Sequence, residues 1–367
     1  MNKISFAGPW ITEKEVNYAI DAVKNGWYQN FDGYIKKLEQ KMCEYLGVKY
    51  CWATPNCTAA LHLACIAIDL KEGDEVIVTD HSWAATAHTI AYTGAKCVFV
   101  DVLESTLCID PSAIEKAITK KTKAIMLVHN FGIPAEMDEI MRIAKKNNIY
   151  VIEDAAPSLG STYKGKLCGS FGDLACFSFQ GAKIAVSGEG GVIVTNNEKL
   201  YEKIKLFADM GRTNSVMPFW CDYLGYEYPL SNICASVALA QVERIEELKK
   251  KKREIYKWYS DNLADNPKIQ MVKEPDYSNS NYCYPSLFIS NNSKTSRDEI
   301  LAKFKESNIH ARPGFPRMSG FPMYERRYQN PVAERMEKYG IVLPSAADLS
   351  KDDANFVSKM LIDLIGA

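Results

Sequence analysis

The central part of the chain alternates short hydrophobic runs with segments of helical period, and this alternation limits the possible folds more than any other feature. Between residues 55 and 195 the runs are EVIVTD (75–80), KCVFVDV (96–102), KAIMLVHNFG (123–132), IYVIEDAA (149–156), ACFSF (175–179) and GVIVT (191–195). Helical patterns such as PSAIEKAI and AEMDEIMRIAKKNN separate several of them, which is typical of βαβ units. The sequence therefore predicts an α/β fold with a mostly parallel central sheet covered by helices.

A long helical pattern from about Ser231 to Leu263 leads out of this region, and strand-like and helical segments follow it. This order predicts a large domain over residues 1–248 and a smaller α/β domain over residues 249–367. The basic run Lys249 to Arg253 is flanked by glutamates, and we expect it to form a solvated helix face with i,i+4 pairs.

Composition argues against several classes of function. The 44 Lys and Arg residues nearly balance the 45 Asp and Glu residues, so no overall charge favours nucleic acid or an anionic membrane. No apolar run approaches the ~20 residues that cross a bilayer, and the first residues lack the apolar core of a signal peptide.

The eleven cysteines stand mostly among apolar residues. We therefore expect a cytoplasmic protein with reduced thiols, and no metal site because CxxC and HExxH spacings do not occur.

Polar side chains follow the predicted strands at the edge where such sheets bind ligands. Asp154 ends the run IYVIED, and Lys183 lies between ACFSF and the glycine cluster GEGG. A lysine in such a loop is most often solvated, and a carboxylate at a strand end is as often a helix N-cap. Together, a reactive amine and a buried carboxylate could instead serve a cofactor.

Three further features have both an ordinary and a functional interpretation. Asn56, Cys57 and Thr58 precede the apolar helical run AALHLACIAI, so their amides are expected at a helix N-terminus, which favours anions. Ser178 is a polar residue at an apolar strand end and could donate to the same anion. Trp83 follows EVIVTD by three residues and could cover a flat ring, although a single tryptophan more often belongs to the core.

These features are together what pyridoxal phosphate (PLP) requires: a lysine, a carboxylate for the pyridine nitrogen, donors for the phosphate and a flat side chain. The stretch EDAAPSLGSTYKGKLCGSFGDLACFSFQGAKIAVSGEGGVIVT strongly resembles the DegT/DnrJ/StrS family of PLP-dependent sugar aminotransferases, whose pattern is EDAA, YKG, FSF, a lysine and GEGG. The likeness continues in NGWYQN, NCTAALHLA, HSWAATAHTI, VHNFGIPAEMDEI and LPSAADLSKDD.

The resemblance implies the aspartate aminotransferase fold (fold type I) and a homodimer with shared active sites, with the N-terminal segment 1–30 near the site. By similarity, Lys183 forms the Schiff base and moves the proton, and Asp154 holds the pyridine nitrogen. The phosphate and ring contacts implied are Asn56, Cys57, Thr58, Ser178 and Trp83.

The resemblance also implies transamination in two halves. An amino-acid donor, usually glutamate or glutamine, converts PLP to its amino form (PMP), which then aminates a nucleotide-linked or phosphorylated keto sugar for a capsule or lipopolysaccharide. A smaller acceptor stays open, such as dihydroxyacetone phosphate giving serinol phosphate, or a cyclitol ketone.

Three other functions are less favoured by the sequence. A PLP-dependent sugar dehydratase of this fold would be expected to carry histidine in place of Lys183. A non-catalytic regulator would be expected to have lost Lys183 or Asp154. A nicotinamide-dependent oxidoreductase predicts GxGxxG after the first strand, and the glycines of this chain stand elsewhere.

The chain departs from the family pattern at two places. Pro157 stands where the family commonly has Gln, His or Glu near the phenolic oxygen of the cofactor. GYEYPL places Glu227 and Pro229 where the family's GYNYRM has Asn and Arg, so we do not expect Glu227 to bind phosphate.

The C-terminal stretch HARPGFPRMSGFPMY supplies Arg312 and Arg317, which suit recognition of phosphate or carboxylate if they lie near the site. Trp10 and Tyr324 are further candidates for contact with substrate. All four residue types also occur commonly in surface loops or in packing.

Overall fold

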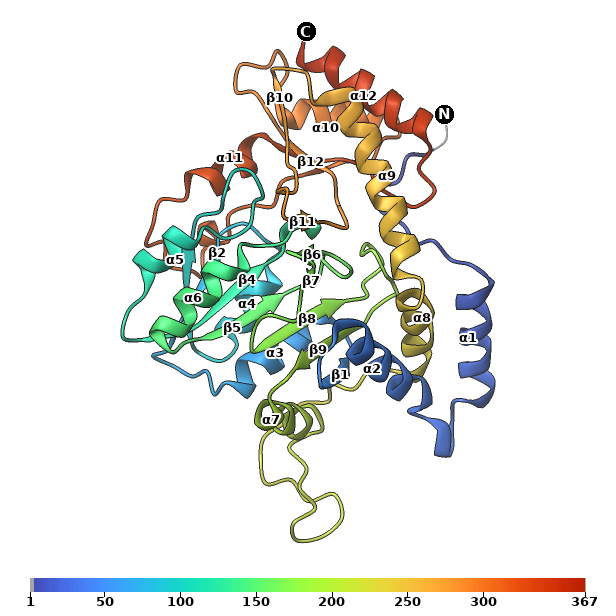
Figure 1. Cartoon of the computed structure of the whole chain (residues 1–367), viewed down its shortest axis with the longest axis vertical. Coiled ribbons are helices and arrows are strands. Elements are labelled where there is room, and N and C mark those ends of the chain that lie inside the picture. Colours follow the sequence, from blue (N-terminus) through green and yellow to red (C-terminus); the bar gives the residue numbers. More distant parts are fainter. Residues whose placement is uncertain (1–2, 367) are drawn as a thin grey trace.

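A computed structural model describes residues 3–366 and is built on a seven-stranded sheet (Figure 1). Its order is β1-β9-β8-β5-β4-β2-β3. The strands are β1 (Tyr50–Thr54), β2 (Glu75–Thr79), β3 (Lys96–Val100), β4 (Thr122–Val128), β5 (Tyr150–Asp154), β8 (Leu174–Ser178) and β9 (Gly191–Thr195). Strands β3, β2, β4, β5 and β8 pair in parallel, whereas β9 is antiparallel to both of its neighbours. The mostly parallel sheet is the one that the sequence predicts.

Helices cover both faces of this sheet, because successive strand residues point to opposite sides and both sets are apolar. In β2, for example, Val76 and Val78 pack with α3, α4 and α7, whereas Ile77 packs with α5 and α6. A third cluster joins α2 and α8 to β1, β8 and β9. These helices are α2 (Gly33–Leu46), α3 (Cys57–Ala67), α4 (Ala85–Ala91), α5 (Pro111–Ala117), α6 (Met137–Asn147), α7 (Glu198–Ala208) and α8 (Asn232–Val242).

The N-terminal segment lies along the outside of α8. Helix α1 (Glu13–Asn25) begins with a capping box in which the Thr12 side chain and the Glu15 side chain each bind the other's backbone N–H. It contacts α8 along its length (Figure 1). Short 3₁₀ helices lie between or after these elements: η1 (Tyr28–Asn30), η2 (Asn130–Gly132) and η3 (Met318–Gly320).

The C-terminal third forms a second, antiparallel sheet of order β10-β12-β14-β13. Its strands are β10 (Ile269–Met271), β12 (Ser286–Ile289), β13 (Arg312–Pro313) and β14 (Gly340–Val342), and its helices are α9 (Ile245–Leu263), α10 (Arg297–Glu306), α11 (Pro331–Tyr339) and α12 (Lys351–Ile365). A small third sheet contains β6 (Thr162–Tyr163), β7 (Lys166–Leu167) and β11 (Ser278–Asn279).

The two large sheets are joined by more than one connection. The predicted domain boundary after residue 248 falls inside α9. Farther on, the chain returns to the first sheet, where the Ser319 side chain and backbone bind Asp80, and the Ala333 N–H binds Asp101. The division at residue 248 therefore stays a prediction.

The basic run at the start of α9 is not uniformly solvated, so that part of the sequence prediction is wrong. Lys249 and Lys252 are buried, and their amines donate to the backbone carbonyls of Gly160 and Ser345. Burial lowers the pKa of both amines. The helix turns this face toward the rest of the protein, and i,i+4 spacing alone does not reveal which face is covered.

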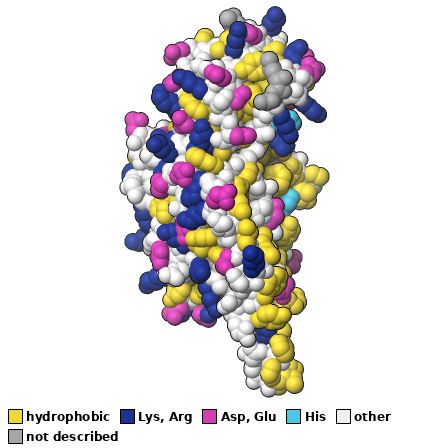
Figure 2. All heavy atoms as spheres, turned by 90° about the vertical axis from the view of Figure 1, so that its right-hand side faces the viewer, with side chains coloured by type: hydrophobic (Ala, Val, Ile, Leu, Met, Phe, Trp, Pro, Cys, Tyr) yellow, Lys and Arg dark blue, Asp and Glu magenta, His cyan; other side chains and the backbone are white. Residues whose placement is uncertain are grey.

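One face of the protein carries many exposed apolar side chains. Figure 2 shows them toward the lower end of that face and at its tip, which is the loop between α7 and α8 at the bottom of Figure 1. The exposed apolar residues of this loop are Met210, Val216, Met217, Phe219, Trp220, Tyr223 and Leu224. In the described residues, no helix combines the length and the apolar character that crossing a membrane requires.

Candidate active site

Asp154 is the last residue of β5, the central strand of the large sheet, and its side chain is buried. The Thr86 hydroxyl donates to one carboxylate oxygen at 2.8 Å, and the Ala156 N–H donates to the other at 3.2 Å. Within residues 3–366, no Lys, Arg or His side chain forms an ion pair with Asp154. A buried carboxylate without a cation is uncommon, so this environment suits a ligand that brings its own N–H.

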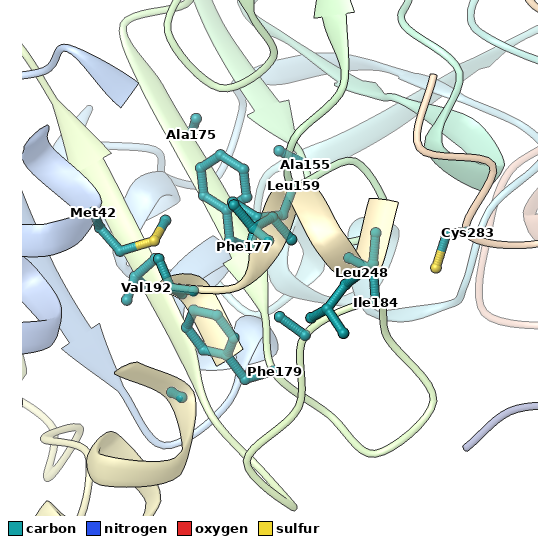
Figure 3. Packing of buried hydrophobic residues seen from close by; sticks show 14 of the residues in the cluster. Met42, Ala155, Leu159, Ala175, Phe177, Phe179, Ile184, Val192, Leu248 and Cys283 are labelled. Carbon is teal, nitrogen blue, oxygen red and sulfur yellow. The ribbon is translucent and has the colours of Figure 1, made fainter. Parts of the chain in front are cut away.

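Lys183 lies in the loop between β8 and β9, and backbone hydrogen bonds hold this loop at several points. Its own N–H donates to Gln180 O at 2.8 Å, and the Ser187 N–H donates to Phe179 O at 2.7 Å. The next residue, Ile184, is buried beside Leu248 of α9 (Figure 3). The lysine is thus presented on an ordered loop whose following residue is anchored in the core.

The charge of Lys183 reaches both Asp154 and the start of α3. Burial raises the pKa of Asp154, whereas the Thr86 hydrogen bond and the Lys183 charge act in the opposite direction. Burial likewise raises the pKa of the Cys57 thiol, and Lys183 again opposes the shift. These interactions show that the three predicted residues share one region at the same edge of the sheet.

The start of α3 lies against the start of β9, and we call these two segments the Gly191 cradle. The Asn56 side chain caps the helix by accepting from the Ala59 N–H at 2.8 Å, which leaves the first-turn amides of Cys57 and Thr58 without helical partners. Gly191 faces this turn, and a Cβ there would lie 2.7 Å from the Cys57 nitrogen. Ser178 pairs with Gly191 across the two strands. Cys57 and Ser178, two of the predicted phosphate-binding residues, therefore both lie next to Gly191, where a side chain larger than that of glycine does not fit.

Replacing Gly191 with alanine is expected to weaken PLP binding by about tenfold or more, because the added Cβ would displace the Cys57 amide from its position and a hydrogen bond to a charged group contributes about 1.5–3 kcal/mol. The measurement is a titration of cofactor-free enzyme with PLP. Gly33→Ala is the control, since nothing lies within 4 Å of a Cβ at that position. Equal affinities for the two variants would contradict this assignment of the cradle.

Trp83 lies on the turn that leads from β2 into α4, and the residue is 65% exposed. Its carbonyl accepts from the N–H of Thr86, the residue that binds Asp154. Its ring meets that of Phe315, with centroids 6.1 Å apart. The exposure excludes the alternative that Trp83 is a core residue and leaves a ring face available for stacking.

Sequence reasoning assigned no role to two residues that support Asp154. Thr86 stands one turn after Trp83 in HSWAATAHTI, and a hydroxyl at that spacing was the available signal. His129 donates its backbone N–H to the Asp154 carbonyl at 3.2 Å, and its ring nitrogen lies 2.9 Å from Glu153. Glu153 also accepts the backbone N–H groups of residues 169, 171 and 172. This pairing fixes the strand end and could not be inferred from the sequence.

The two candidate arginines lie in different environments. Arg312 is exposed, with its guanidinium 5.4 Å from the Phe6 ring centroid, and among the described residues no carboxylate forms an ion pair with it. Arg317 is paired with both Glu334 and Glu337, at 3.1 and 2.7 Å. Arg312 is therefore free to bind an anion, whereas the charge of Arg317 is already compensated within the chain.

Trp10 and Tyr324 have contacts of their own. The Trp10 carbonyl accepts from Gln241 and Arg244, and its ring lies under the Arg244 guanidinium at 5.3 Å. The Tyr324 hydroxyl lies 2.6 Å from the His88 ring nitrogen. Their contact with substrate stays a prediction.

The two departures from the family pattern also have defined positions. Pro157 is buried, and its carbonyl accepts from the Asn281 side chain at 2.9 Å. Glu227 is exposed in the loop between α7 and α8, where it forms an isolated bridge with Asp209.

Comparison with known proteins assigns the chain to a family. The model of the DegT/DnrJ/EryC1/StrS aminotransferase family matches residues 9–361. The GDP-perosamine synthase of Escherichia coli O157:H7 is 38% identical over 362 residues and 98% of both chains. The putative pyridoxal phosphate-dependent aminotransferase EpsN of Bacillus subtilis (strain 168) is 33% identical, over 99% of this chain and 96% of that one. The solved structure of the putative sugar aminotransferase Spr1654 from Streptococcus pneumoniae, in its PMP form, has a TM-score of 0.91 at 25% identity, over 99% of this chain and 98% of that one.

These findings confirm the predicted fold type I, the cofactor PLP and the aminotransferase activity. The site fits that cofactor, because the carboxylate of Asp154 lacks a cation and the cradle at Gly191 offers amides to an anion. The chain belongs to the DegT/DnrJ/EryC1/StrS aminotransferase family.

Proposed function

We propose that the enzyme transfers an amino group from an amino acid, L-glutamate or L-glutamine, to the keto group of a nucleotide-linked sugar used in surface polysaccharides. The observation that carries this proposal is a basic pocket against the Lys183 loop. The pocket has a volume of about 280 Å³ and is lined by Lys3, His310, Arg312 and residues 180–182, with no Asp or Glu in its lining. Such a pocket favours the phosphates of a nucleotide or the carboxylate of an amino acid.

The names of relatives support a nucleotide-sugar acceptor. The relative that is named GDP-perosamine synthase matches nearly the whole chain. A nucleoside diphosphate sugar carries two phosphates, which matches the surplus of basic side chains in the pocket.

Each residue of the site would have its own chemical role. PLP, when bound, accepts electrons from the carbon that carries the amino group and holds that group between the two half-reactions. The Lys183 Nζ would bind the cofactor and, once released, would move a proton to or from the reacting carbon. The Asp154 carboxylate would hold the proton of the ring nitrogen, and Thr86 orients that carboxylate. The Cys57 and Thr58 amides, with Ser178, would bind the phosphate.

Arg312→Gln is expected to raise the KM for a nucleotide keto sugar about tenfold or more with little change in kcat, since it removes a charge-assisted contact made equally before and during reaction. Steady-state kinetics with nucleotide keto sugars and with dihydroxyacetone phosphate measure this and also test the small-acceptor alternative. Arg317→Gln is the control, because that guanidinium is already paired with Glu334 and Glu337. A raised KM in the control alone, or turnover of dihydroxyacetone phosphate alone, would contradict the proposal.

The size of the pocket also supports a homodimer with shared sites. A volume of about 280 Å³ lies below the ~300–1,000 Å³ of typical ligand pockets, so it would hold only part of a nucleotide sugar. The apolar loop between α7 and α8, together with the exposed Val16, Ile20 and Val23 of α1, offers a surface for a second copy of the chain. Light scattering at micromolar concentration tests this, and a monomeric mass would contradict it.

We also propose that the enzyme works in the cytoplasm. All eleven cysteines, which lie within the described residues, are free thiols, and most of them are buried. This state fits a reducing compartment. Fractionation of the native cells tests the assignment, and recovery of the enzyme outside the cytosolic fraction would contradict it.

A further inference from the structure

Tyr284 reaches the lysine loop from the segment that leads into β12 of the second sheet. Its hydroxyl donates to the carbonyl of Ala182, the residue before Lys183, at 2.7 Å. Tyr284 is 7% exposed, and the two residues are 102 positions apart in the sequence. This contact therefore links the second sheet directly to the backbone that presents the lysine.

The ring of Tyr284 is fixed by other aromatic side chains and lies under the lysine. It stacks on Phe6, with centroids 5.4 Å apart and planes at 13°, and it meets the edge of Phe131 at 6.2 Å and 89°. The Lys183 Nζ lies 5.8 Å from its centroid, which is within the range of a cation–π contact. The ring has little freedom to move, so it limits where the amine of Lys183 can lie.

The backbone before Tyr284 is also held in place. The Cys283 N–H donates to the Asn281 side chain at 2.8 Å, and the Cys283 carbonyl accepts from the Ser345 hydroxyl at 3.1 Å. The buried Lys252 amine in turn donates to that same hydroxyl at 3.2 Å. These bonds give Tyr284 a rigid support from α9 and from the segment after β14.

We propose that Tyr284 is a positioning residue for Lys183: its hydroxyl fixes the Ala182 carbonyl, and its ring supports the lysine side chain on the side of the basic pocket. Phe6, which lines that pocket, stacks on Tyr284 and carries Arg312 over its own ring at 5.4 Å. One aromatic stack thus joins the anion-binding arginine to the cofactor-binding lysine. The inference rests on the proposed function in assigning the cofactor to Lys183.

The test is Tyr284→Phe, which removes one hydroxyl and keeps the ring. Tyr259→Phe is the matched control, because the Tyr259 hydroxyl is also buried and donates to a backbone carbonyl, that of Pro344, at 3.0 Å. Two properties are measured for each variant: hydrogen exchange of the amides of residues 181–187, with and without PLP, and the kinetic constants of transamination.

For Tyr284→Phe we expect exchange in residues 181–187 to be at least about tenfold faster and kcat about tenfold lower, with the KM of the acceptor unchanged, because a small misplacement of a reacting group is costly. For Tyr259→Phe we expect both properties to match the wild type. The proposal is overturned if the two variants behave alike, or if Tyr284→Phe changes KM alone.

A second variant covers the case in which Tyr284→Phe does not fold. Phe6→Leu keeps the Tyr284 hydroxyl but removes the stacked ring, and we expect faster exchange in the same amides, with wild-type rates contradicting the proposal. The exchange measured without PLP also distinguishes a failure of this proposal from a failure of the proposed function. If no form of the enzyme binds PLP, the proposed function fails, whereas the contact between Tyr284 and the loop is still decided by exchange.

Discussion

Lys183→Ala is expected to lower kcat by about 10³-fold or more and to abolish the visible absorbance of the bound cofactor. The amine is the group that would bind the cofactor and move the proton in both half-reactions, and losses on this scale are typical when the covalent group of an active site is removed. Lys183 stands on an ordered loop, with the buried Ile184 next to it, so the substitution should leave the fold intact. Single-turnover kinetics with the amino donor and absorbance spectra measure the effect.

Lys166→Ala is the control for this prediction. Lys166 is exposed and makes a cation–π contact with Phe171 at 4.4 Å, in the small sheet outside the site. Its loss should leave kcat and the spectrum unchanged. An active, coloured Lys183→Ala enzyme would contradict the assignment of the cofactor to Lys183.

Asp154→Asn is expected to lower kcat by about 10²-fold or more, while raising the melting temperature of the cofactor-free enzyme. The amide keeps the shape of the carboxylate but cannot stabilise a protonated ring nitrogen, and a lost charge interaction in an active site costs on the order of 10²–10³ in rate. Thermal stability is expected to rise although kcat falls, because burial raises the pKa of the Asp154 carboxyl. A carboxyl whose folded pKa is raised contributes stability below its unfolded pKa and loses it as pH rises through the folded pKa.

At neutral pH the ionised Asp154 therefore destabilises the cofactor-free fold, and the neutral asparagine removes that penalty. Thermal unfolding at pH 7 and at pH 4 measures this, with the gain over wild type expected to shrink at the lower pH. Thr86→Val serves as the comparison, since it keeps the carboxylate and removes only the hydroxyl that orients it. A full-activity Asp154→Asn enzyme, or one destabilised at neutral pH, would contradict the role given to Asp154.

Much of the sheet and of the cofactor site can be predicted from the sequence, because both depend on local patterns. Apolar runs with alternate faces buried require helices on both sides, and in such a sheet the residues after the strands share one edge. Asp154, Lys183 and the start of α3 meet there for this reason. The antiparallel β9 was not predicted, since a short apolar run carries no information on direction.

The remaining features depend on contacts between residues distant in the sequence. Arg312 and Arg317 are equivalent in their local sequence, and only the position of α11 shows that glutamates neutralise one of them. The contact of Tyr284 with Ala182 crosses 102 positions. For Gly191, a cluster of glycines signals a tight turn, but its closeness to the Cys57 amide follows only from the packing of α3 on β9.

The proposed mechanism depends most on the bond between Lys183 and PLP. The direct measurement is mass spectrometry of peptides from enzyme that has been incubated with PLP and reduced with borohydride. We expect a reduced phosphopyridoxyl group on the peptide that contains Lys183, with its amount halved or lower when Gly191 is replaced by alanine at limiting PLP. Modification confined to other lysines, with Lys183 unmodified, would contradict it.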